Sequence, residues 1–171
     1  MADDKATEPH WLNSAEQYAW RHYLRGSAQL MEKINKDMLA DNDLTLNEYE
    51  VLVRLSEAPE HNLRMSLLAE NLVHSRSRLT HTVSRLEVMG YVERESCADD
   101  KRGVNCILTD KGYKKLEKAA PSHVESVRRH IVDVLTPQEF SEWGRIWRKL
   151  VDDCECDDVN CTLVGLPHEA K

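Results

Sequence analysis

The sequence predicts a mainly helical protein with one small β-hairpin, and three observations support this fold class. Apolar residues recur at spacings of three and four over most of the chain, as expected for amphipathic helices. The spacing changes to two only over residues 91–96 and 104–108, as expected for strands. Serine or threonine precedes most of the helical stretches, where a side-chain oxygen can cap a helix. The length of 171 residues suits one domain, or one compact lobe with a helical extension.

The first half of the chain is expected to form a long helix, a second helix, a short link or small strand, and a short helix, at residues 14–41, 45–58, 63–65 and 66–72. Ser14 can cap the long helix, with Gln17 as the second member of a capping box. Thr45 and Ser66 can cap the two helices that follow. Val73 and His74 then form a tight turn.

The second half is expected to form a helix, a two-stranded hairpin around a polar loop, and two more helices, at residues 75–89, 91–108, 109–135 and from 136 onward. Gly90 is placed to end the first of these helices in the left-handed conformation. Pro121 is expected to kink the helix at 109–135, because it lacks a backbone donor. Thr136 and Glu139 form a capping box at the start of the last helix.

The element order between residues 45 and 108 is that of a winged helix-turn-helix, and its helix from Ser75 has two distinct faces. Leu79, Val83 and Leu86 form the inner face. The opposite face holds hydrogen-bond donors and cations without a carboxylate, which suits base edges and phosphates in a major groove: Ser77, Thr80, His81 and Ser84, flanked by Arg78 and Arg85. The alternative is a solvated surface helix, but the short helix, turn and hairpin around it favour DNA.

The hairpin loop supplies a second signal. Arg102 at its tip can enter a narrow minor groove, and Asp100 can brace the guanidinium through a charge-assisted hydrogen bond. The alternative is an ordinary charged turn. The net charge of −7 does not oppose DNA binding, because the acids concentrate elsewhere, as at residues 152–158.

These segments resemble the MarR (multiple antibiotic resistance regulator) family. The resemblance lies in Leu-Ala-Glu-Asn-Leu at 68–72, Ser-Arg-Ser-Arg-Leu-Thr at 75–80, and Arg-Leu-Glu-Val-Met-Gly-Tyr-Val-Glu-Arg at 85–94. It continues in Asp-Lys-Arg-Gly at 100–103 and Leu-Thr-Asp-Lys-Gly at 108–112, and it covers about residues 14–153. Lys101 stands where an arginine is more usual, which keeps the charge but changes the hydrogen-bonding geometry.

The resemblance implies a triangular homodimer that binds double-stranded DNA at a pseudo-palindromic operator. It also implies a repressor that a small ligand, often an aromatic acid, releases from DNA. The expected regions are an N-terminal dimerisation helix (1–44), the DNA-binding domain (45–112), C-terminal dimerisation helices (113–153) and a tail (154–171). The expected DNA contacts are Ser75, Arg76, Ser77, Arg78, Thr80, His81, Ser84, Arg85, Asp100, Lys101 and Arg102.

An effector pocket is expected to draw on two helices, through Trp20, Tyr23, Ser27, Met31, Tyr49 and Leu52. Arg25, Arg54 or Arg64 could meet an anionic ligand. The alternative is that these aromatic residues are simply core at helical spacing.

Five cysteines raise the question of redox sensing. Cys97 lies where strand meets loop, so its oxidation could move Arg102. Cys106 is expected to be a small strand residue. Cys154, Cys156 and Cys161 stand near His168, but their spacing is not a standard zinc pattern, and we expect no metal and no cofactor.

Other functions are disfavoured by what the sequence lacks. No apolar run is long enough for a membrane span, and the start has no secretory pattern, so we expect a cytoplasmic protein. The histidines and carboxylates fall in no catalytic motif, so we expect no enzyme. A winged fold that has lost DNA binding and serves as a protein-interaction module stays as the alternative to a regulator.

Overall fold

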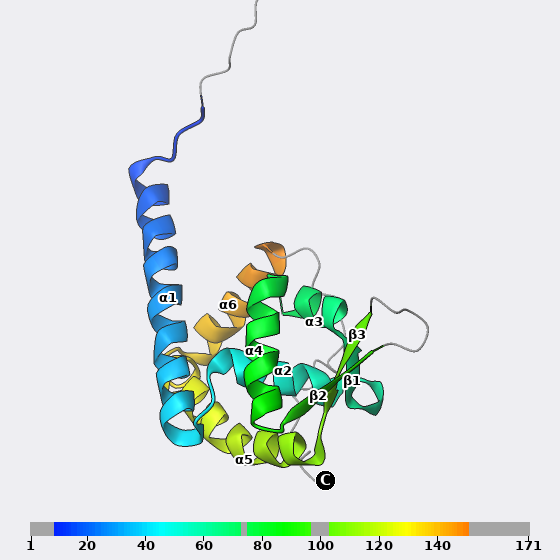
Figure 1. The fold of residues 1–171 in the computed structure, drawn as a ribbon. Helices are drawn as coiled ribbons and strands as arrows, with labels where there is room; N and C mark the ends of the chain where they lie inside the picture. The colour runs from blue at the N-terminus through cyan, green and yellow to red at the C-terminus, as the bar shows by residue number, and fades with distance from the viewer. Residues whose placement is uncertain (1–8, 73–74, 97–102, 151–171) are drawn as a thin grey trace, which may run out of the picture. The chain divides into compact units, whose positions relative to one another are not determined.

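The computed structural model describes residues 9–72, 75–96 and 103–150. The chain forms two compact units, Met1–Lys33 and Ile34–Lys171, and each is considered by itself. Helix α1 (Ser14–Asn42) supplies the described part of the first unit together with residues 9–13, and its last turns belong to the second (Figure 1). Over the described ranges, no helix has the length and apolar character needed to cross a bilayer.

Helix α1 begins with a capping box that is shifted by one residue from the predicted pair. Asn13 Oδ1 accepts from the Glu16 N–H at 3.0 Å, and Glu16 Oε2 accepts from the Asn13 N–H at 2.7 Å. The predicted Ser14–Gln17 pair is wrong, and Gln17 Nε2 instead donates to the Leu12 carbonyl at 2.9 Å. A carboxylate in the first turn also interacts with the helix dipole, which a glutamine does not.

The second unit follows the predicted order of elements. After α1 come α2 (Leu46–Glu57), the 3-10 turn η1 (Pro59–His61), β1 (Asn62–Arg64), α3 (Met65–Asn71), α4 (Arg76–Val88), β2 (Val92–Ser96), β3 (Val104–Leu108), α5 (Asp110–Val127), the π-helical η2 (Arg128–Val132) and α6 (Pro137–Leu150). Ser66 was expected to cap α3, but the capping position is Arg64, whose side chain makes no capping hydrogen bond. Strand β1 leads directly into α3, so no cap residue separates them.

The three strands form an antiparallel sheet in the order β1-β3-β2. Leu63 of β1 faces Cys106 of β3, and β2 pairs with β3 from Val92↔Leu108 to Ser96↔Val104. Strand β3 is therefore central, and its other edge is held by the strand that precedes α3. Mainly helical structure with a small hairpin is confirmed.

The core of the second unit lies between α2, α4, α5 and the sheet (Figure 1). Helix α2 packs against both α4 and α5, and α4 also packs against β2. The side chains with less than 2% exposure include Met38, Leu44, Leu52, Leu55, Leu68, Leu79, Leu86, Val83, Val92 and Cys106. Thr45 caps α2 as predicted, through a capping box with Glu48.

Helix α5 continues through Pro121, and the helix departs from α geometry only later, at η2. One helix to residue 135 was expected. The π segment places Arg129 and His130 beside Asp37 of α1, whose Oδ2 lies 2.8 Å from Arg129 Nη2 and 2.8 Å from His130 Nε2. The buried Ser126 hydroxyl donates to the same oxygen at 2.6 Å. These contacts, led by the Ser126 hydrogen bond, lower the pKa of Asp37.

Helix α6 begins at the predicted capping box, in which Thr136 Oγ1 accepts from the Glu139 N–H at 3.3 Å. Its apolar stripe stays open to solvent in the single chain. Phe140, Ile146 and Leu150 have exposed fractions of 39%, 42% and 68%.

Candidate nucleic-acid interface

Helix α4 has the buried face and the caps that its sequence predicts. Leu79, Val83 and Leu86 are at most 1% exposed. Ser75 Oγ accepts from the Arg78 N–H at 3.3 Å and so caps the helix. Gly90, two residues after α4, has φ +73°, which a side chain would strain. The inner face therefore fixes which side of α4 meets solvent.

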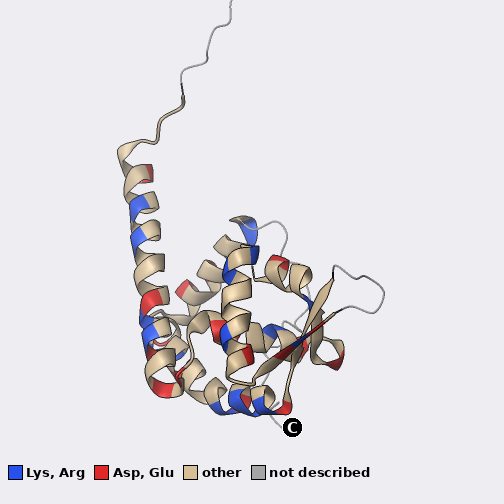
Figure 2. Ribbon diagram, viewed as in Figure 1, with Lys and Arg blue, Asp and Glu red and all other residues tan. Residues whose placement is uncertain are grey.

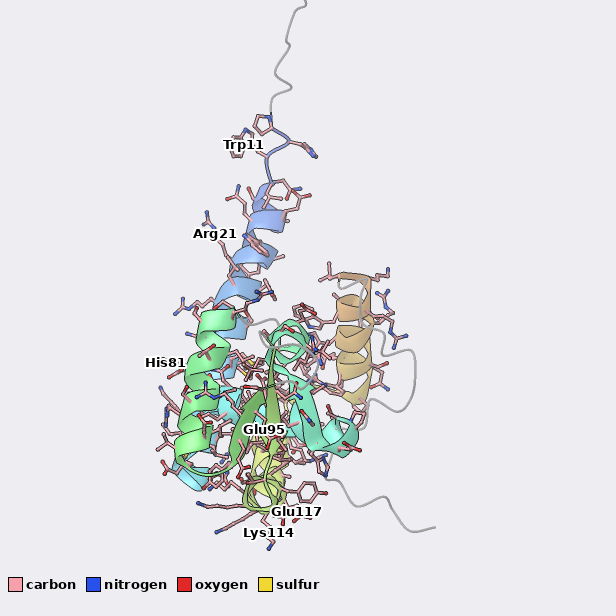
Figure 3. The ribbon with its side chains drawn as sticks, turned by 45° about the vertical axis from the view of Figure 1, so that its right-hand side comes forward. Trp11, Arg21, His81, Glu95, Lys114 and Glu117 are labelled. Carbon is pink, nitrogen blue, oxygen red and sulfur yellow. The ribbon has the colours of Figure 1, made fainter. Side chains whose placement is uncertain are left out.

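The outer face of α4 carries polar donors. Ser77, Thr80 and His81 are exposed and Ser84 is half-buried, and Figure 3 shows His81 on the outer side of the helix. The Thr80 hydroxyl donates to the Arg76 carbonyl at 2.8 Å, which leaves its oxygen lone pairs turned outward as acceptors. This face can therefore donate and accept hydrogen bonds.

Two arginines stand in the N-terminal half of α4. Within the described residues, neither Arg76 nor Arg78 forms an ion pair, and both side chains are exposed. Glu50 of α2 lies near enough to Arg78 to feel its charge, although burial is the stronger influence and raises the pKa of Glu50. The N-terminal half of α4 is thus strongly cationic (Figure 2).

The C-terminal half of α4 differs, because its charged side chains form ion pairs with other elements. Arg85 Nε lies 3.2 Å from Oε1 of Glu48, a residue of α2 that is 1% exposed. Glu87 of α4 accepts from Arg94 Nε of β2 at 3.0 Å. The sequence prediction of a face without carboxylates holds along α4 itself up to Glu87, but it missed Glu48, which is 37 positions away.

Two hollows flank α4. One, of about 300 Å³, lies between the starts of α3, α4 and β3 and is lined by Arg64, Met65, Ser66, Arg76, Thr80, Gly103 and Val104. The other, of about 440 Å³, lies against the start of α2 and is lined by Thr45, Asn47, Glu48, Ser77, Arg78, His81, Thr82 and Arg85. Arg64 was considered only as a partner for an effector, yet it shares the first hollow with Arg76. The position of Arg64 in the sequence, in the short segment directly before the helix from residue 65, could have indicated that it lies near α4.

The hairpin loop begins beside this first hollow. Ser96 and Val104 form the last pair of the hairpin, and Gly103 and Val104 line the hollow together with Arg76. Asp100, Lys101 and Arg102 lie outside the described residues, so their predicted contacts stay predictions.

The residues expected to bind an effector fall into two groups. In the first unit, Trp20, Tyr23 and Met31 are exposed on α1, and the Trp20 and Tyr23 rings stack with centroids 5.5 Å apart. The Ser27 hydroxyl donates to the Tyr23 carbonyl at 2.7 Å.

In the second unit, Tyr49 and Leu52 are core residues, 5% and 0% exposed, and burial raises the pKa of Tyr49. The Tyr49 ring lies 4.5 Å from that of His123, whose Nδ1 is buried and has no partner among the described residues. Arg54, one candidate for an anion, pairs with Glu57 at 3.1 Å.

The cysteines that suggested redox or metal chemistry lie outside the described residues, namely Cys97, Cys154, Cys156 and Cys161, as does His168. Cys106 is fully buried in β3, and burial raises the pKa of its thiol to about 12. Such a thiol is almost entirely protonated at neutral pH, which disfavours Cys106 as an oxidant sensor. The described ranges contain no cluster of three or more His, Cys, Asp or Glu residues that could hold a metal ion.

Comparison with known proteins identifies the fold. The model of the MarR family matches residues 44–104. Sco3205, a MarR family transcriptional regulator from Streptomyces coelicolor solved in complex with DNA, is 41% identical, with a TM-score of 0.78 over 83% of this chain and 92% of that one. AbsC, a MarR family regulator from the same organism, is 40% identical, with a TM-score of 0.76 over 84% and 97%.

The curated relatives agree with these structures. The HTH-type transcriptional regulator PecS of Dickeya dadantii is 30% identical over 72% of this chain and 77% of its own length. The transcriptional repressor MprA of Escherichia coli is 28% identical over 77% and 76%. All these relatives are transcriptional regulators, which confirms the expectation that the chain is not an enzyme. The winged helix-turn-helix, the coverage and the identity together show that the chain belongs to the MarR family of transcriptional regulators.

Proposed function

We propose that the protein is a homodimeric transcriptional repressor that reads a pseudo-palindromic DNA operator with helix α4. The observation that carries this proposal is the two-sided character of α4. Its inner face is buried in the core. Its N-terminal half presents exposed hydroxyls and two exposed arginines, Arg76 and Arg78, and neither arginine forms an ion pair within the described residues. A rigidly mounted cationic helix of this kind suits a major groove.

The dimensions of α4 agree with this role. Thirteen residues span about 20 Å at 1.5 Å per residue, and the major groove, about 12 Å wide, admits one helix. The N-terminal residues of a reading helix meet the base edges, which assigns that role to Arg76, Ser77 and Thr80. The helix dipole adds partial positive charge at the same end. Ser75, Arg78, His81, Ser84 and Arg85 complete the proposed contact surface of α4.

The hairpin is proposed to act as a wing, with Lys101 and Arg102 in the adjacent minor groove and Asp100 bracing Arg102. The position of Gly103 and Val104 beside Arg76 supports this assignment, because it places the root of the loop next to the first turn of α4. The relative Sco3205 was solved in complex with DNA, which supports DNA binding by this chain.

Dimerisation is proposed to use the apolar residues of α1 and α6. Trp20, Tyr23, Leu24 and Met31 of α1 are 43–51% exposed in the single chain. A dimer places two copies of α4 for two half-sites, which matches the two-fold symmetry of a palindrome. We propose the same roles for the predicted regions: residues 1–44 and 113–153 for dimerisation, residues 45–112 for DNA binding, and residues 154–171 as the tail.

We further propose that a small aromatic or anionic effector releases the repressor. The stacked pair Trp20–Tyr23 supports an aromatic ligand at the edge of the proposed dimer interface, because a flat ring can extend the stack. Met31 and Ser27 belong to the same proposed site. Tyr49 and Leu52 are core residues, so their participation requires a local rearrangement on binding.

The direct test begins with selection of bound duplexes from a random library, followed by anisotropy measurements on the selected operator. Arg76→Ala is expected to weaken binding to the selected operator by about 5–100-fold, as for the loss of a contact to a base edge. Arg54→Ala, which removes a cation paired with Glu57, is the matched control and should leave affinity unchanged. A wild-type protein that enriches no duplex would contradict the proposal and favour a protein-interaction module.

A further inference from the structure

The two halves of helix α4 differ in what their charged side chains contact. Arg76 and Arg78 in the first half form no ion pair within the described residues, whereas Arg85 and Glu87 in the last turn each pair with another element. Arg85 pairs with Glu48 of α2, and Glu87 pairs with Arg94 of β2. Residues two apart on a helix point about 200° from one another, so the two pairs lie on opposite sides of α4.

Glu48 is the most deeply buried of these four groups. Its residue is 1% exposed, and its Oε2 is used at the start of α2, where it accepts from the Thr45 N–H at 2.8 Å and from the Thr45 hydroxyl at 2.9 Å. Its Oε1 is buried and accepts no hydrogen bond within the described residues. The cation nearest to this oxygen is the Arg85 guanidinium, with Nε at 3.2 Å.

A buried carboxylate oxygen without a hydrogen bond needs a neighbouring cation, because burial removes the water that would otherwise stabilise its charge. If Arg85 moved to a DNA phosphate, Glu48 would lose that cation. The apolar contacts of Leu79, Val83 and Leu86 attract α4 to the core but are non-directional. Packing of the buried face sets which side of α4 points inward, and the directional ion pair between Arg85 and Glu48 adds a restraint on the last turn of the helix.

We infer that Glu48 is a positioning residue for DNA reading, which holds Arg85 and thereby fixes the orientation of α4, while the bases are read from the N-terminal half. The inference rests on the proposed function and revises it at one residue. Arg85 stands in the proposed contact surface by sequence, but it anchors the helix rather than contacting DNA. Its position agrees, since it lies nine residues, or about 13 Å, along the helix from Arg76.

The test uses the full-length protein and the selected operator, with a scrambled duplex of the same length. Glu48→Gln keeps a carbonyl oxygen for the Thr45 cap and removes the charge that holds Arg85. We expect this variant to bind the operator about 5–100-fold more weakly, with binding to the scrambled duplex unchanged, because a misaligned helix loses base readout and keeps phosphate contacts. Arg85→Ala should do the same and should keep the salt slope of the wild type.

Coupling gives the second readout. The double variant Glu48→Gln/Arg85→Ala should be no weaker than either single variant, because both remove one interaction. Arg76→Ala is the matched control, and its loss should add to that of Glu48→Gln. Arg85→Lys keeps the charge, so it should bind the operator more tightly than Arg85→Ala does. This comparison of two Arg85 variants still tests the inference if Glu48→Gln fails to fold.

Three outcomes would overturn the inference. If Arg85 contacts a phosphate, Arg85→Ala lowers the salt slope by about one and Glu48→Gln leaves affinity unchanged or raises it, because it releases the guanidinium. If Glu48 is merely structural, Glu48→Gln lowers the melting temperature, yet the operator-to-scrambled ratio stays at the wild-type value in the folded protein. If the wild type prefers no duplex, the proposed function fails as well, whereas the first two outcomes leave it intact.

Discussion

Helices α4 and α1 carry apolar stripes at the same sequence spacing, but they use them differently. The stripe of α4 is at most 1% exposed, whereas the stripe of α1 is 43–51% exposed at Trp20, Tyr23, Leu24 and Met31. Helical spacing predicts that a face is buried, but it does not distinguish burial within the same chain from burial against a second chain. The partner of the α4 stripe lies within the unit, in α2 and the sheet. The partner of the α1 stripe is proposed to be a second copy.

The exposure of the apolar stripe also changes along α1 itself. Ile34 and Met38 are only 3% and 1% exposed, and they continue the stripe that is open to solvent up to Met31. The last turns of α1 therefore belong to the core of the second unit. One helix thus combines an exposed apolar stripe in the first unit with a buried one in the second.

The largest expected effect is on the buried stripe of α4. Leu86→Ala removes a fully buried side chain and is expected to lower the free energy of unfolding by about 2–5 kcal/mol, since the cavity is lined by a packed core. Urea unfolding at several protein concentrations measures it. Val88→Ala, at an 89% exposed position of the same helix, should change it by less than about 0.5 kcal/mol. Equal losses for the two variants would contradict the assignment of faces.

The next largest effect is expected on the exposed apolar stripe of α1, and it should appear as a change in the protein concentration at which the proposed dimer forms. Trp20→Ala is expected to raise the dissociation constant of the dimer by about 30-fold, as for a buried interface tryptophan worth about 2 kcal/mol. Sedimentation equilibrium measures this constant. Trp11→Ala, at an 80% exposed position before α1, is the control and should have no effect. A wild type that sediments as a monomer would remove the proposed partner of the stripe.

The smallest effect tests the boundary between the two parts of α1. Asp37→Asn weakens the contacts to Ser126, Arg129 and His130 and is expected to lower the free energy of unfolding by about 0.5–1.5 kcal/mol at pH 7. Asp41→Asn, one turn further along and exposed, should have little effect. Urea unfolding titrations of both variants give the comparison.

The same carboxyl predicts the direction of a pH dependence. The pKa of Asp37 is lower in the folded protein than the ordinary value of 3.8, so the folded state favours the charged form. Its contribution is fully present above that value and is lost as the pH falls through the folded-state pKa. Stability should therefore drop less steeply in acid for Asp37→Asn than for the wild type, and parallel profiles would show that this carboxyl contributes nothing.

The features predicted correctly from sequence are those that depend on neighbours along the chain. The faces of α4, the caps at Ser75, Thr109 and Thr136, and the left-handed Gly90 all follow from residues within four positions of each other. The cap of α1 was missed by one residue because Asn13 and Ser14 are both good caps, and only the reciprocal bond to Glu16 distinguishes them.

The features that could not be predicted join distant parts of the chain. Glu48 and Arg85 are each ordinary surface types in the sequence, and only the packing of α2 on α4 brings them together. Two of the three partners of Asp37, Arg129 and His130, lie in the π turn at residues 128–132, where hydrogen bonds run from i to i+5 rather than i to i+4. No local pattern in that segment distinguishes a π turn from the continuous helix that was expected.

The contacts of Asp37 also bear on the order in which a nascent chain can fold. Its partners Ser126, Arg129 and His130 lie 89, 92 and 93 positions later in the sequence. At ribosomal speeds of 5–20 residues per second, this interval lasts about 5–20 s. Helix α1 is translated first, yet its C-terminal turns cannot settle against α5 until that helix has emerged. During that time the apolar stripe of α1 stays open, which would give two chains translated side by side the opportunity to form the proposed dimer before either core is complete.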